Sequence, residues 1–325
     1  DALIEQEMAK LTPDLKFLAQ CAKAFQQVGN SERAEQIADY LLEAAPNDID
    51  HIVLKADILF AKEQHLECFS ILSKAALERP QNTAIAFCFA NLLLHLSRNY
   101  EALPYLELCT RKKPSDAKGR ELHVHCLLML ERYDQADLLI RDWIKHHQHF
   151  TPTSERKRTI GQFQWLRAFI EFGRGNIEQA WEHYGARFDT GAVNGAVFLN
   201  YPAPSWTGED LKGKTLLVWS DQGLGDTLKG ASLIPELAQS AEKIILETEP
   251  RFVPFFSNSF PQIEVRPFTG TTGTQAARKS KKQTDFDLAF CLSDTPRFLR
   301  PDLKSFEKVR ETVYTTDIER ARNIL

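Results

Sequence analysis

Apolar and polar positions alternate with helical spacing through the amino-terminal half of this 325-residue chain. Apolar residues recur three or four positions apart, as at Leu54 and Ile58, and this spacing is typical of amphipathic helices. The pattern breaks over an irregular stretch at 146–158 and stops after Phe188. It predicts successive antiparallel helix pairs, with one further pair beyond the irregular stretch.

Two kinds of residue repeat every 34 positions within this helical region. A period of 34 is the length of the tetratricopeptide hairpin. Small residues would stand where the two helices of a hairpin cross closely, and proline would stop the second helix because it cannot continue one. The small residues are Ala34, Cys68, Ala102 and Ala136, and the prolines are Pro46, Pro80 and Pro114.

A turn is expected between the two helices of each hairpin, and glycine marks the first of these turns. Gly29, followed by Asn30, makes the first turn, whereas the equivalent positions Glu63, Ser97 and Glu131 have no glycine. The sequence "GRGNIEQA" at 173–180 repeats the first turn and its crossing alanine. Residues 1–190 are therefore expected to form an α-solenoid of about five tetratricopeptide-type hairpins.

A row of polar residues is expected on the inner wall of this solenoid. Stacked hairpins build a curved superhelix, whose concave face comes mainly from the first helix of each pair. Steps of 34 residues from Lys23 reach four polar residues, which we predict to line a peptide-binding groove. The alternative interpretation is that they are ordinary solvated residues at a repeating position. The row, here called the ladder, is Lys23, Asp57, Asn91 and His125.

The carboxyl-terminal half has a different pattern. A connector at 191–213 is followed by four short apolar runs rich in strand formers, with helix-like stretches between them. This order predicts an α/β Rossmann-like domain with a mostly parallel sheet at 214–325. The expected strands are 215–220, 243–247, 262–267 and 286–291, the expected helices are 227–239 and 250–260, and 269–284 is expected to be a surface loop.

A glycine-containing turn follows the first expected strand and opens a helix. Ligands of α/β sheets bind at such turns, where glycine lets a ligand approach the backbone and free amides favour an anion or a hydroxyl. Asp226 could accept a proton from a nucleophilic hydroxyl, or it could simply be the N-cap of the helix. The expected ligand-binding residues around it are Gln222, Gly223, Leu224, Gly225 and Thr227.

Three stretches carry a family resemblance. They read "GNIEQAWEHYGARF", "PAPSWTGEDLKGKTLLVWSDQGLGDT" and "KIILETEPRFVPFF", and the likeness extends over 173–265. The chain resembles bacterial proteins that fuse tetratricopeptide repeats to a GT-B glycosyltransferase module. That module is related to lipopolysaccharide heptosyltransferases and more distantly to the O-linked N-acetylglucosamine transferases. The resemblance implies metal-independent sugar transfer, with Asp226 as the catalytic base.

The chain departs from the family pattern in several places. Asp221 stands where the family usually has glutamate, and "LKGASLIP" replaces aromatic and arginine residues after the turn. Of the asparagine ladder that holds acceptor peptides in the O-linked N-acetylglucosamine transferases, only Asn91 is present. The nucleotide-sugar donor is expected to bind a second domain beginning where this chain ends, at Leu325. No cofactor is therefore expected in this chain, and it is expected to be inactive alone.

Composition excludes several classes of function. The net charge of −4 does not suit a nucleic-acid binder, and no apolar run reaches the roughly 18 residues needed to cross a membrane. The six cysteines include no CxxC pair and fall mostly in apolar helical stretches, which favours a reducing, cytoplasmic setting.

Two other motifs are rejected. A phosphate-loop pattern at 208–215 precedes its strand instead of following it, which is the wrong order for that loop. The cluster His146, His147 and His149 suits a solvated helix end better than a metal site, so no metal is expected. Trp165, Trp181 and Tyr184 are expected at the seam between the helical part and the sheet.

The leading hypothesis is a protein glycosyltransferase. The repeats would bind the acceptor protein, and the α/β domain would form the acceptor side of the active site. The alternative is a non-catalytic tetratricopeptide adaptor carrying a remnant half-domain. A third possibility, a chaperone-binding protein, needs a basic clamp for carboxylates, and the acidic Asp57 argues against it.

Overall fold

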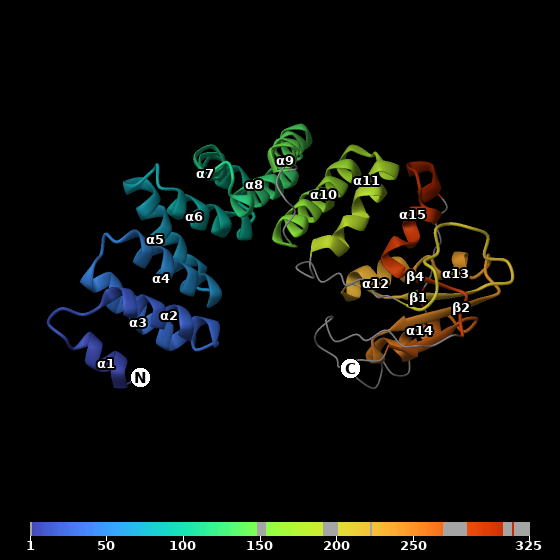
Figure 1. The fold of residues 1–325 in the computed structure, drawn as a ribbon, viewed down its shortest axis with the longest axis horizontal. Coiled ribbons are helices and arrows are strands. Elements are labelled where there is room, and N and C mark those ends of the chain that lie inside the picture. Colours follow the sequence, from blue (N-terminus) through green and yellow to red (C-terminus); the bar gives the residue numbers. More distant parts are fainter. Residues whose placement is uncertain are drawn as a thin grey trace. The chain divides into compact units, whose positions relative to one another are not determined.

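The computed structural model describes residues 2–147, 154–190, 201–221, 223–268, 285–307 and Tyr314. By internal contacts the chain divides into two compact units, Asp1–Trp143 and Ile144–Leu325. The first unit is helical, and the second contains helices and a sheet (Figure 1). The boundary expected from the sequence lies at residue 190, whereas the internal contacts group the fifth helical hairpin with the sheet.

The first unit is a series of helical hairpins preceded by a short helix. Each hairpin packs against the next, so a continuous core forms where no single pair could bury its apolar face. The helices are α1 (Ala2–Met8), α2 (Leu15–Gln27), α3 (Ser31–Ala44), α4 (Ile49–Ala61), α5 (His65–Glu78), α6 (Thr83–His95), α7 (Asn99–Lys112), α8 (Ala117–Met129) and α9 (Tyr133–His147).

The 34-residue markers have the structural roles expected of them. All four small residues at the helix crossings are at most 1% exposed. Helices α3, α5 and α7 end at Ala44, Glu78 and Lys112, each two residues before one of the repeated prolines. The helical solenoid predicted from the sequence is confirmed for this part of the chain.

The turns inside the hairpins share one backbone conformation even where glycine is missing. Gly29 has a φ of 83°, and the equivalent Glu63, Ser97 and Glu131 have φ values of 59°, 58° and 57°. A left-handed residue at this place closes the helix end with a backbone hydrogen bond, such as that from the Arg98 amide to the Leu93 carbonyl at 2.7 Å. Three turns therefore adopt a conformation that is costly for a residue with a side chain.

The residues that cap the helices repeat with the same period, a signal in the sequence that the prediction of the repeats did not use. The N-cap residues of α2, α4, α6 and α8 recur every 34 positions, and each side chain accepts a hydrogen bond from a backbone amide of the first turn. Such caps satisfy amides that have no partner within the helix. The four residues are Asp14, Asp48, Asn82 and Asp116.

The first helices of successive hairpins lie side by side. Contacts join α2 to α4, α4 to α6 and α6 to α8, in addition to the contacts within each hairpin. The four ladder positions therefore occur on adjacent helices within one layer of the first unit.

The fifth hairpin belongs to the second unit. It consists of α10 (Ser154–Arg174) and α11 (Ile177–Tyr184), joined at Gly175, whose φ is 79°. The interpretation of 146–158 as irregular is wrong at both ends, because α9 continues to His147 and α10 already begins at Ser154. A short 3-10 helix, η1 (Gly185–Thr190), follows α11.

The second unit contains a four-stranded, wholly parallel sheet of order β3-β2-β1-β4. The strands are β1 (Thr215–Trp219), β2 (Lys243–Thr248), β3 (Glu264–Pro267) and β4 (Leu288–Cys291). In the central strand, Leu217 stands opposite Ile245 on one side and Ala289 on the other. The predicted parallel sheet is confirmed among the described residues, and the predicted loop at 269–284 lies outside them.

Short helices connect these strands. The single helix expected at 227–239 is instead two, α12 (Leu224–Ala231) and α13 (Ile234–Leu237). The helix expected at 250–260 is present as η2 (Pro250–Phe252) followed by α14 (Val253–Ser259). After β4 come η4 (Leu292–Asp294), α15 (Thr295–Leu299) and η5 (Leu303–Glu307).

Each face of the sheet has its own apolar core. On one face Val218 and Leu246 pack with residues of α12, α13 and α14, including Phe256. On the other face Trp219 and Ile245 pack with Tyr201, Phe188 and other apolar residues. Tyr201 of the connector and Phe188 of η1 thus cover part of the face that these helices leave open.

The described part of the connector is attached to the edge strand. The Trp206 amide donates to the Ala289 carbonyl, and the Ala289 amide donates to the Pro204 carbonyl, both at 3.0 Å. Trp206 and Leu211 are buried against the sheet. Residues 201–211 are therefore packed into the second unit.

Candidate functional site

The glycine turn lies at the carboxyl end of β1, the central strand. β1 ends at Trp219, and α12 begins at Leu224. β2 pairs with one side of β1, and β4 pairs with the other side. The strand order therefore reverses at β1, which makes the carboxyl end of this strand a topological switch point. Crevices at such a point are where open α/β sheets bind ligands.

The turn is open to solvent. Gly223, Leu224 and Gly225 are exposed, and a Cβ added at either glycine would have no heavy atom within 4 Å. Gly223 is the N-cap of α12, with φ −67° and ψ 178°, a conformation that any residue can adopt. Glycine therefore supplies open space here rather than a special backbone conformation. Gln222 lies outside the described residues.

Asp226 is the third residue of α12. The alternative interpretation of Asp226 as the N-cap is wrong, because Gly223 occupies that position. The Asp226 side chain is 41% exposed, and its Oδ1 lies 3.8 Å from Nζ of the exposed Lys229. Thr227, the next residue, is buried, and its hydroxyl donates to the Gly223 carbonyl at 3.0 Å.

A buried ionic network lies under the turn. Arg187 of η1 is fully buried, and its Nε lies 3.1 Å from Oδ2 of Asp221, which is also fully buried. Its Nη1 lies 2.7 Å from Oδ1 of Asp294, whose side chain is 21% exposed. Arg187 therefore ties the segment after the fifth hairpin to the ends of both β1 and β4.

Neighbouring groups complete this network. The Ser293 hydroxyl donates to Oδ1 of Asp221 at 2.5 Å, and Arg187 also donates to the Cys291 sulfur at 3.4 Å. The guanidinium lies over the Phe188 ring at 4.1 Å from its centroid. Arg187 is surrounded by two carboxylates and a sulfur acceptor, and the Ser293 hydroxyl donates to one of those carboxylates, so the charges that burial would otherwise make costly are satisfied.

The pKa shifts in the network follow from burial and pairing. Burial raises the pKa of Asp294, and the adjacent Arg187 cation opposes that rise. Burial alone would lower the pKa of Arg187, but Asp294 and Asp221 raise it overall. Arg187 accordingly remains a permanent cation that fixes the positions of the two carboxylates.

Tyr184, at the end of α11, brings the turn and the network together. Burial raises the pKa of its phenol, the Arg187 cation opposes this, and the charges of Asp221, Asp226 and Asp294 raise it further. Asp226 is thus close enough to Tyr184 to interact electrostatically, although it belongs to a different helix. The described part of the site combines an exposed carboxylate with a rigid charged base beneath it.

Sequence reasoning missed the residues that build this base. Arg187 stands in the "GARF" segment of the first family-like stretch, but a lone arginine after a helix gave no sign of burial. Asp294 lies after the fourth strand in "FDLAFCLSDTPRFL", a stretch with only weaker agreement to the family, and no role was expected for it. Asp221 was noted only as a departure from glutamate, whereas the structure gives it a buried partner. Trp181, expected at a seam, donates to the Arg300 carbonyl at 3.2 Å.

The ladder residues lie on four adjacent helices of the first unit. Lys23, Asp57 and His125 are exposed, and Asn91 is partly exposed. Their helices α2, α4, α6 and α8 contact one another in that order. The row predicted from the 34-residue period is therefore accessible in the structure.

Electrostatic interactions link part of the ladder. Desolvation by the surrounding helices raises the pKa of the Asp57 carboxyl although the residue reaches solvent, while Lys23 and Lys118 oppose this, and the Cys88 thiol lies 3.9 Å from the carboxylate. The same desolvation lowers the pKa of the His125 imidazole. The face is thus a polar surface of mixed charge, to which Lys118 and Cys88 contribute although the sequence analysis did not select them.

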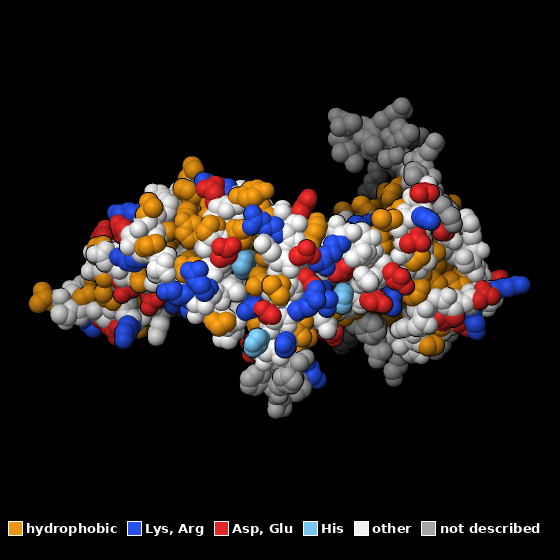
Figure 2. Space-filling model, turned by 90° about the horizontal axis from the view of Figure 1, so that it is seen from above, with side chains coloured by type: hydrophobic (Ala, Val, Ile, Leu, Met, Phe, Trp, Pro, Cys, Tyr) orange, Lys and Arg blue, Asp and Glu red, His pale blue; other side chains and the backbone are white. Residues whose placement is uncertain are grey.

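The two rejected motifs lie in different parts of the chain. Residues 208–215 run into the first residue of β1, so they cannot form the loop after a strand and before a helix that binds phosphate. Among the described residues there is no cluster of three or more His, Cys, Asp or Glu side chains suited to a metal ion; His149 lies outside them. Figure 2 shows basic and acidic side chains interspersed over the face that it presents.

Two further features are the hydropathy of the helices and the state of the cysteines. In the described part of the chain, no helix combines the length and the apolar character needed to cross a bilayer. The six cysteines are free thiols. Burial raises the pKa of several of them, including Cys68 to about 11, so these thiols are poorly reactive.

A family model and a curated relative match this chain. The family described as "Anaphase-promoting complex, cyclosome, subunit 3" matches residues 27–109, within the helical hairpins. The repeats are of the tetratricopeptide type. Protein FlbA of Caulobacter vibrioides is 24% identical over 283 residues, which cover 85% of this chain and 46% of FlbA. The chain therefore spans about half the length of this relative.

Solved repeat proteins share similarity with the chain. A tetratricopeptide repeat protein from Parabacteroides merdae has a TM-score of 0.44 and 14% identity, covering 54% of this chain and 65% of that one. YrrB, described as having an unusual peptide-binding site, has a TM-score of 0.42 and 19% identity, covering 59% and 92%. Both scores lie below 0.5, so the repeat assignment rests on the 34-residue hairpin geometry itself.

Proposed function

We propose that this chain is the acceptor-side part of a protein glycosyltransferase. The tetratricopeptide-type repeats bind the acceptor protein along the ladder Lys23, Asp57, Asn91 and His125. The α/β unit is the Rossmann-like first half of a GT-B module, and it presents the acceptor hydroxyl to Asp226. A nucleotide-sugar supplies the sugar from a domain outside this chain.

The observation that carries the proposal is the exposed Asp226 at the carboxyl edge of a parallel sheet. Its carboxylate is 41% exposed, next to two glycines with open space above them. A general base must reach the proton that it removes, and this position gives a large substrate such as a protein access to the carboxylate. Asp226 would take the hydroxyl proton as the oxygen attacks the anomeric carbon, inverting its configuration.

The rigid base beneath the turn supports this role. Catalytic groups need fixed positions, because small displacements lower rates strongly. Arg187 links η1, Asp221 after β1 and Asp294 after β4, so the turn begins from an anchored residue. Asp221 itself is fully buried and paired, which leaves Asp226 as the accessible carboxylate of the turn.

The repeats support the second part of the proposal. Tetratricopeptide hairpins create extended surfaces that bind polypeptides, and the ladder offers a cation, a carboxylate, an amide and an imidazole along one layer. The similarity to FlbA, which extends over most of this chain and therefore over both units, supports treating the repeats and the sheet as parts of one protein.

The test is sugar transfer by the longest natural form of the protein carrying Asp226→Asn. This change removes the proton acceptor and keeps the shape, so transfer should fall by about 10²–10⁴-fold, the usual contribution of a general base. Glu242→Gln is the matched control, since Glu242 is an exposed carboxylate elsewhere in the same unit. A correctly folded Asp226→Asn protein with unchanged transfer would exclude Asp226 as the base. An adaptor without catalytic function would transfer no sugar in either form.

A further inference from the structure

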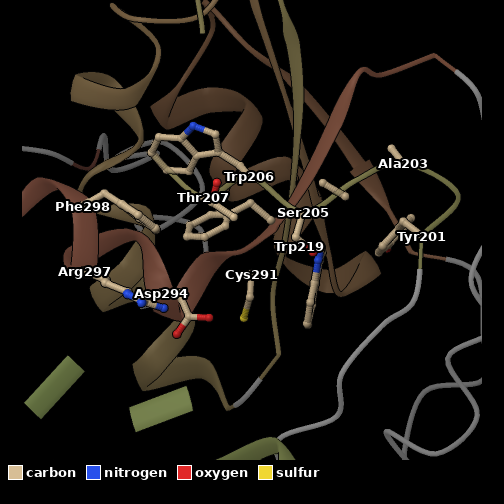
Figure 3. Close-up of a pocket in the computed structure, with 12 residues that line it drawn as sticks. Tyr201, Ala203, Ser205, Trp206, Thr207, Trp219, Cys291, Asp294, Arg297 and Phe298 are labelled. Atoms are coloured by element: carbon tan, nitrogen blue, oxygen red, sulfur yellow. The ribbon is translucent and has the colours of Figure 1, made fainter. Parts of the chain in front are cut away.

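A second feature of the α/β unit includes Asp294 of the network described above but neither Asp226 nor the glycines of the turn. It is a cavity of about 230 Å³ at the carboxyl ends of β1 and β4 (Figure 3). The connector forms one wall, and α15 with the residue before it forms another. The side chains that matter to the argument are Ser205, Trp206, Trp219, Asp294, Arg297 and Phe298.

Rigid aromatic rings shape the cavity. The centroids of Trp206 and Phe298 are 4.7 Å apart, and the Trp206 indole donates to the Glu209 carbonyl at 2.9 Å, which fixes its orientation. A Cβ at Gly208 would come within 2.9 Å of the Phe298 ring, so this glycine allows the backbone to close against it. The aromatic wall is therefore held in place before any ligand arrives.

Polar groups face these rings. Figure 3 shows Asp294 and Arg297 next to each other, with Trp219 across from them. Arg187 holds Oδ1 of Asp294 at 2.7 Å, yet a carboxylate has further acceptor positions, and this one is 21% exposed. Arg297 is exposed and carries several donors. The cavity thus offers a fixed acceptor and a donor opposite apolar surfaces.

The size of the cavity restricts the ligand. Pockets for drug-sized ligands have volumes of about 300–1,000 Å³, and this one is smaller. A complete nucleotide-sugar exceeds it, whereas one six-membered ring fits. Aromatic walls suit the apolar faces of such a ring, and the carboxylate and guanidinium suit hydroxyl groups at its edge.

We propose that this cavity binds a single hydroxylated six-membered ring, the size and chemistry of one sugar residue. The partly exposed Phe298 contacts a face of the ring, and Trp206 and Trp219 border it with the small parts of their side chains that reach the cavity. Asp294 accepts hydrogen bonds from its hydroxyls, and Arg297 donates to its oxygens. This binding is independent of Asp226 and of sugar transfer, so the cavity and the proposed reaction are tested separately.

The test uses the indole N–H signals of the chain in NMR spectra. Of the five tryptophans, Trp206 and Trp219 line the cavity, and the other three, Trp143, Trp165 and Trp181, serve as internal controls. Methyl β-glucopyranoside should shift the first two signals and leave the other three unchanged. Cyclohexanol, a ring of similar size with one hydroxyl, should bind about tenfold more weakly because it lacks most of the hydrogen bonds.

Variants locate the binding. Ser205→Phe fills the cavity from an exposed position and should abolish the shifts, whereas Ser240→Phe, at an exposed site elsewhere in the unit, should not. Arg297→Met changes an exposed side chain and should weaken glucoside binding about tenfold. No shift with the glucoside, equal binding of cyclohexanol, or unchanged binding by the Ser205→Phe protein would each overturn the proposal.

Discussion

Nε of Arg187 lies 3.1 Å from Oδ2 of Asp221, and both side chains are completely shielded from solvent. This pair joins η1, which follows the fifth helical hairpin, to the residue that begins the glycine turn. The hairpin and the sheet are therefore connected by charge as well as by packing. The turn that leads to Asp226 starts from this buried residue.

Removing the Arg187 cation should strongly destabilise the protein. Arg187→Met leaves Asp221 and Asp294 without their shared partner, and loss of one member of a buried ion pair costs about 3–5 kcal/mol in the free energy of unfolding. Urea unfolding of the second unit measures the change. Arg251→Met is the control, since Arg251 is 69% exposed and should cost less than about 1 kcal/mol. Equal small losses in the two variants would contradict the role of Arg187.

The left-handed turn at Ser97 predicts a stabilising substitution. A residue with a side chain pays for a positive φ, whereas glycine does not. Ser97→Gly should therefore raise the free energy of unfolding by about 0.5–1 kcal/mol, after allowance for the greater freedom of glycine in the unfolded chain. Ser97→Ala also removes the hydroxyl but keeps the strain, so it should not stabilise. Thermal unfolding distinguishes the two, and a stabilising alanine would show that the backbone conformation is irrelevant.

His123 should make stability depend on pH below neutrality. Burial lowers the pKa of this imidazole from 6.5 to about 4, with the nearby Arg120 contributing, and its Nδ1 lies 2.9 Å from the Thr110 hydroxyl. Between pH 6.5 and pH 4 the unfolded chain therefore binds a proton at His123 that the folded chain does not bind. The stabilisation that the neutral, buried His123 gives to the folded state is fully present above pH 6.5, and it is lost as the pH falls toward 4.

The loss from this residue should amount to about 3 kcal/mol across that window. His123→Asn removes the titrating group, so the difference in unfolding free energy between wild type and variant should shrink as the pH falls from 6.5 to 4. A difference that stays constant with pH would show that His123 does not titrate differently in the two states.

Substitution of a ladder residue should weaken binding of the partner protein without unfolding the repeats. Asn91 has an amide that can donate to and accept from a peptide backbone, and two such hydrogen bonds are worth about tenfold in affinity. Asn91→Ala should weaken binding of the acceptor protein by that factor in calorimetry. Gln81→Ala, an exposed amide in the loop before α6, is the control and should bind normally. Equal affinities for the two variants would make Asn91 an ordinary solvated residue.

The sequence was most informative where a physical requirement repeats. The prolines and small residues predicted the hairpins, because helix ends and close crossings restrict the residue type in every repeat. The capping residues, such as Asn82, carried an equally regular signal that was overlooked. The parallel sheet was predictable from strand-forming runs separated by helix-like stretches.

The site was less predictable because its base is built from distant segments. Arg187, Asp221 and Asp294 come from three separate places in the sequence, and nothing in the local pattern joins them. Asp226 could be found because it stands in a recognisable turn, but its place in the third position of α12 depends on which residue caps the helix. Which residues pair across such long sequence separations can be known only once the fold is known.

The most direct test of the account is the rate of sugar transfer at saturating acceptor protein. Asp226→Asn should retain the wild-type affinity for the acceptor, because we propose that binding takes place on the repeats, while transfer falls by about 10²–10⁴-fold. Transfer at the wild-type rate by a folded Asp226→Asn protein would contradict the central claim.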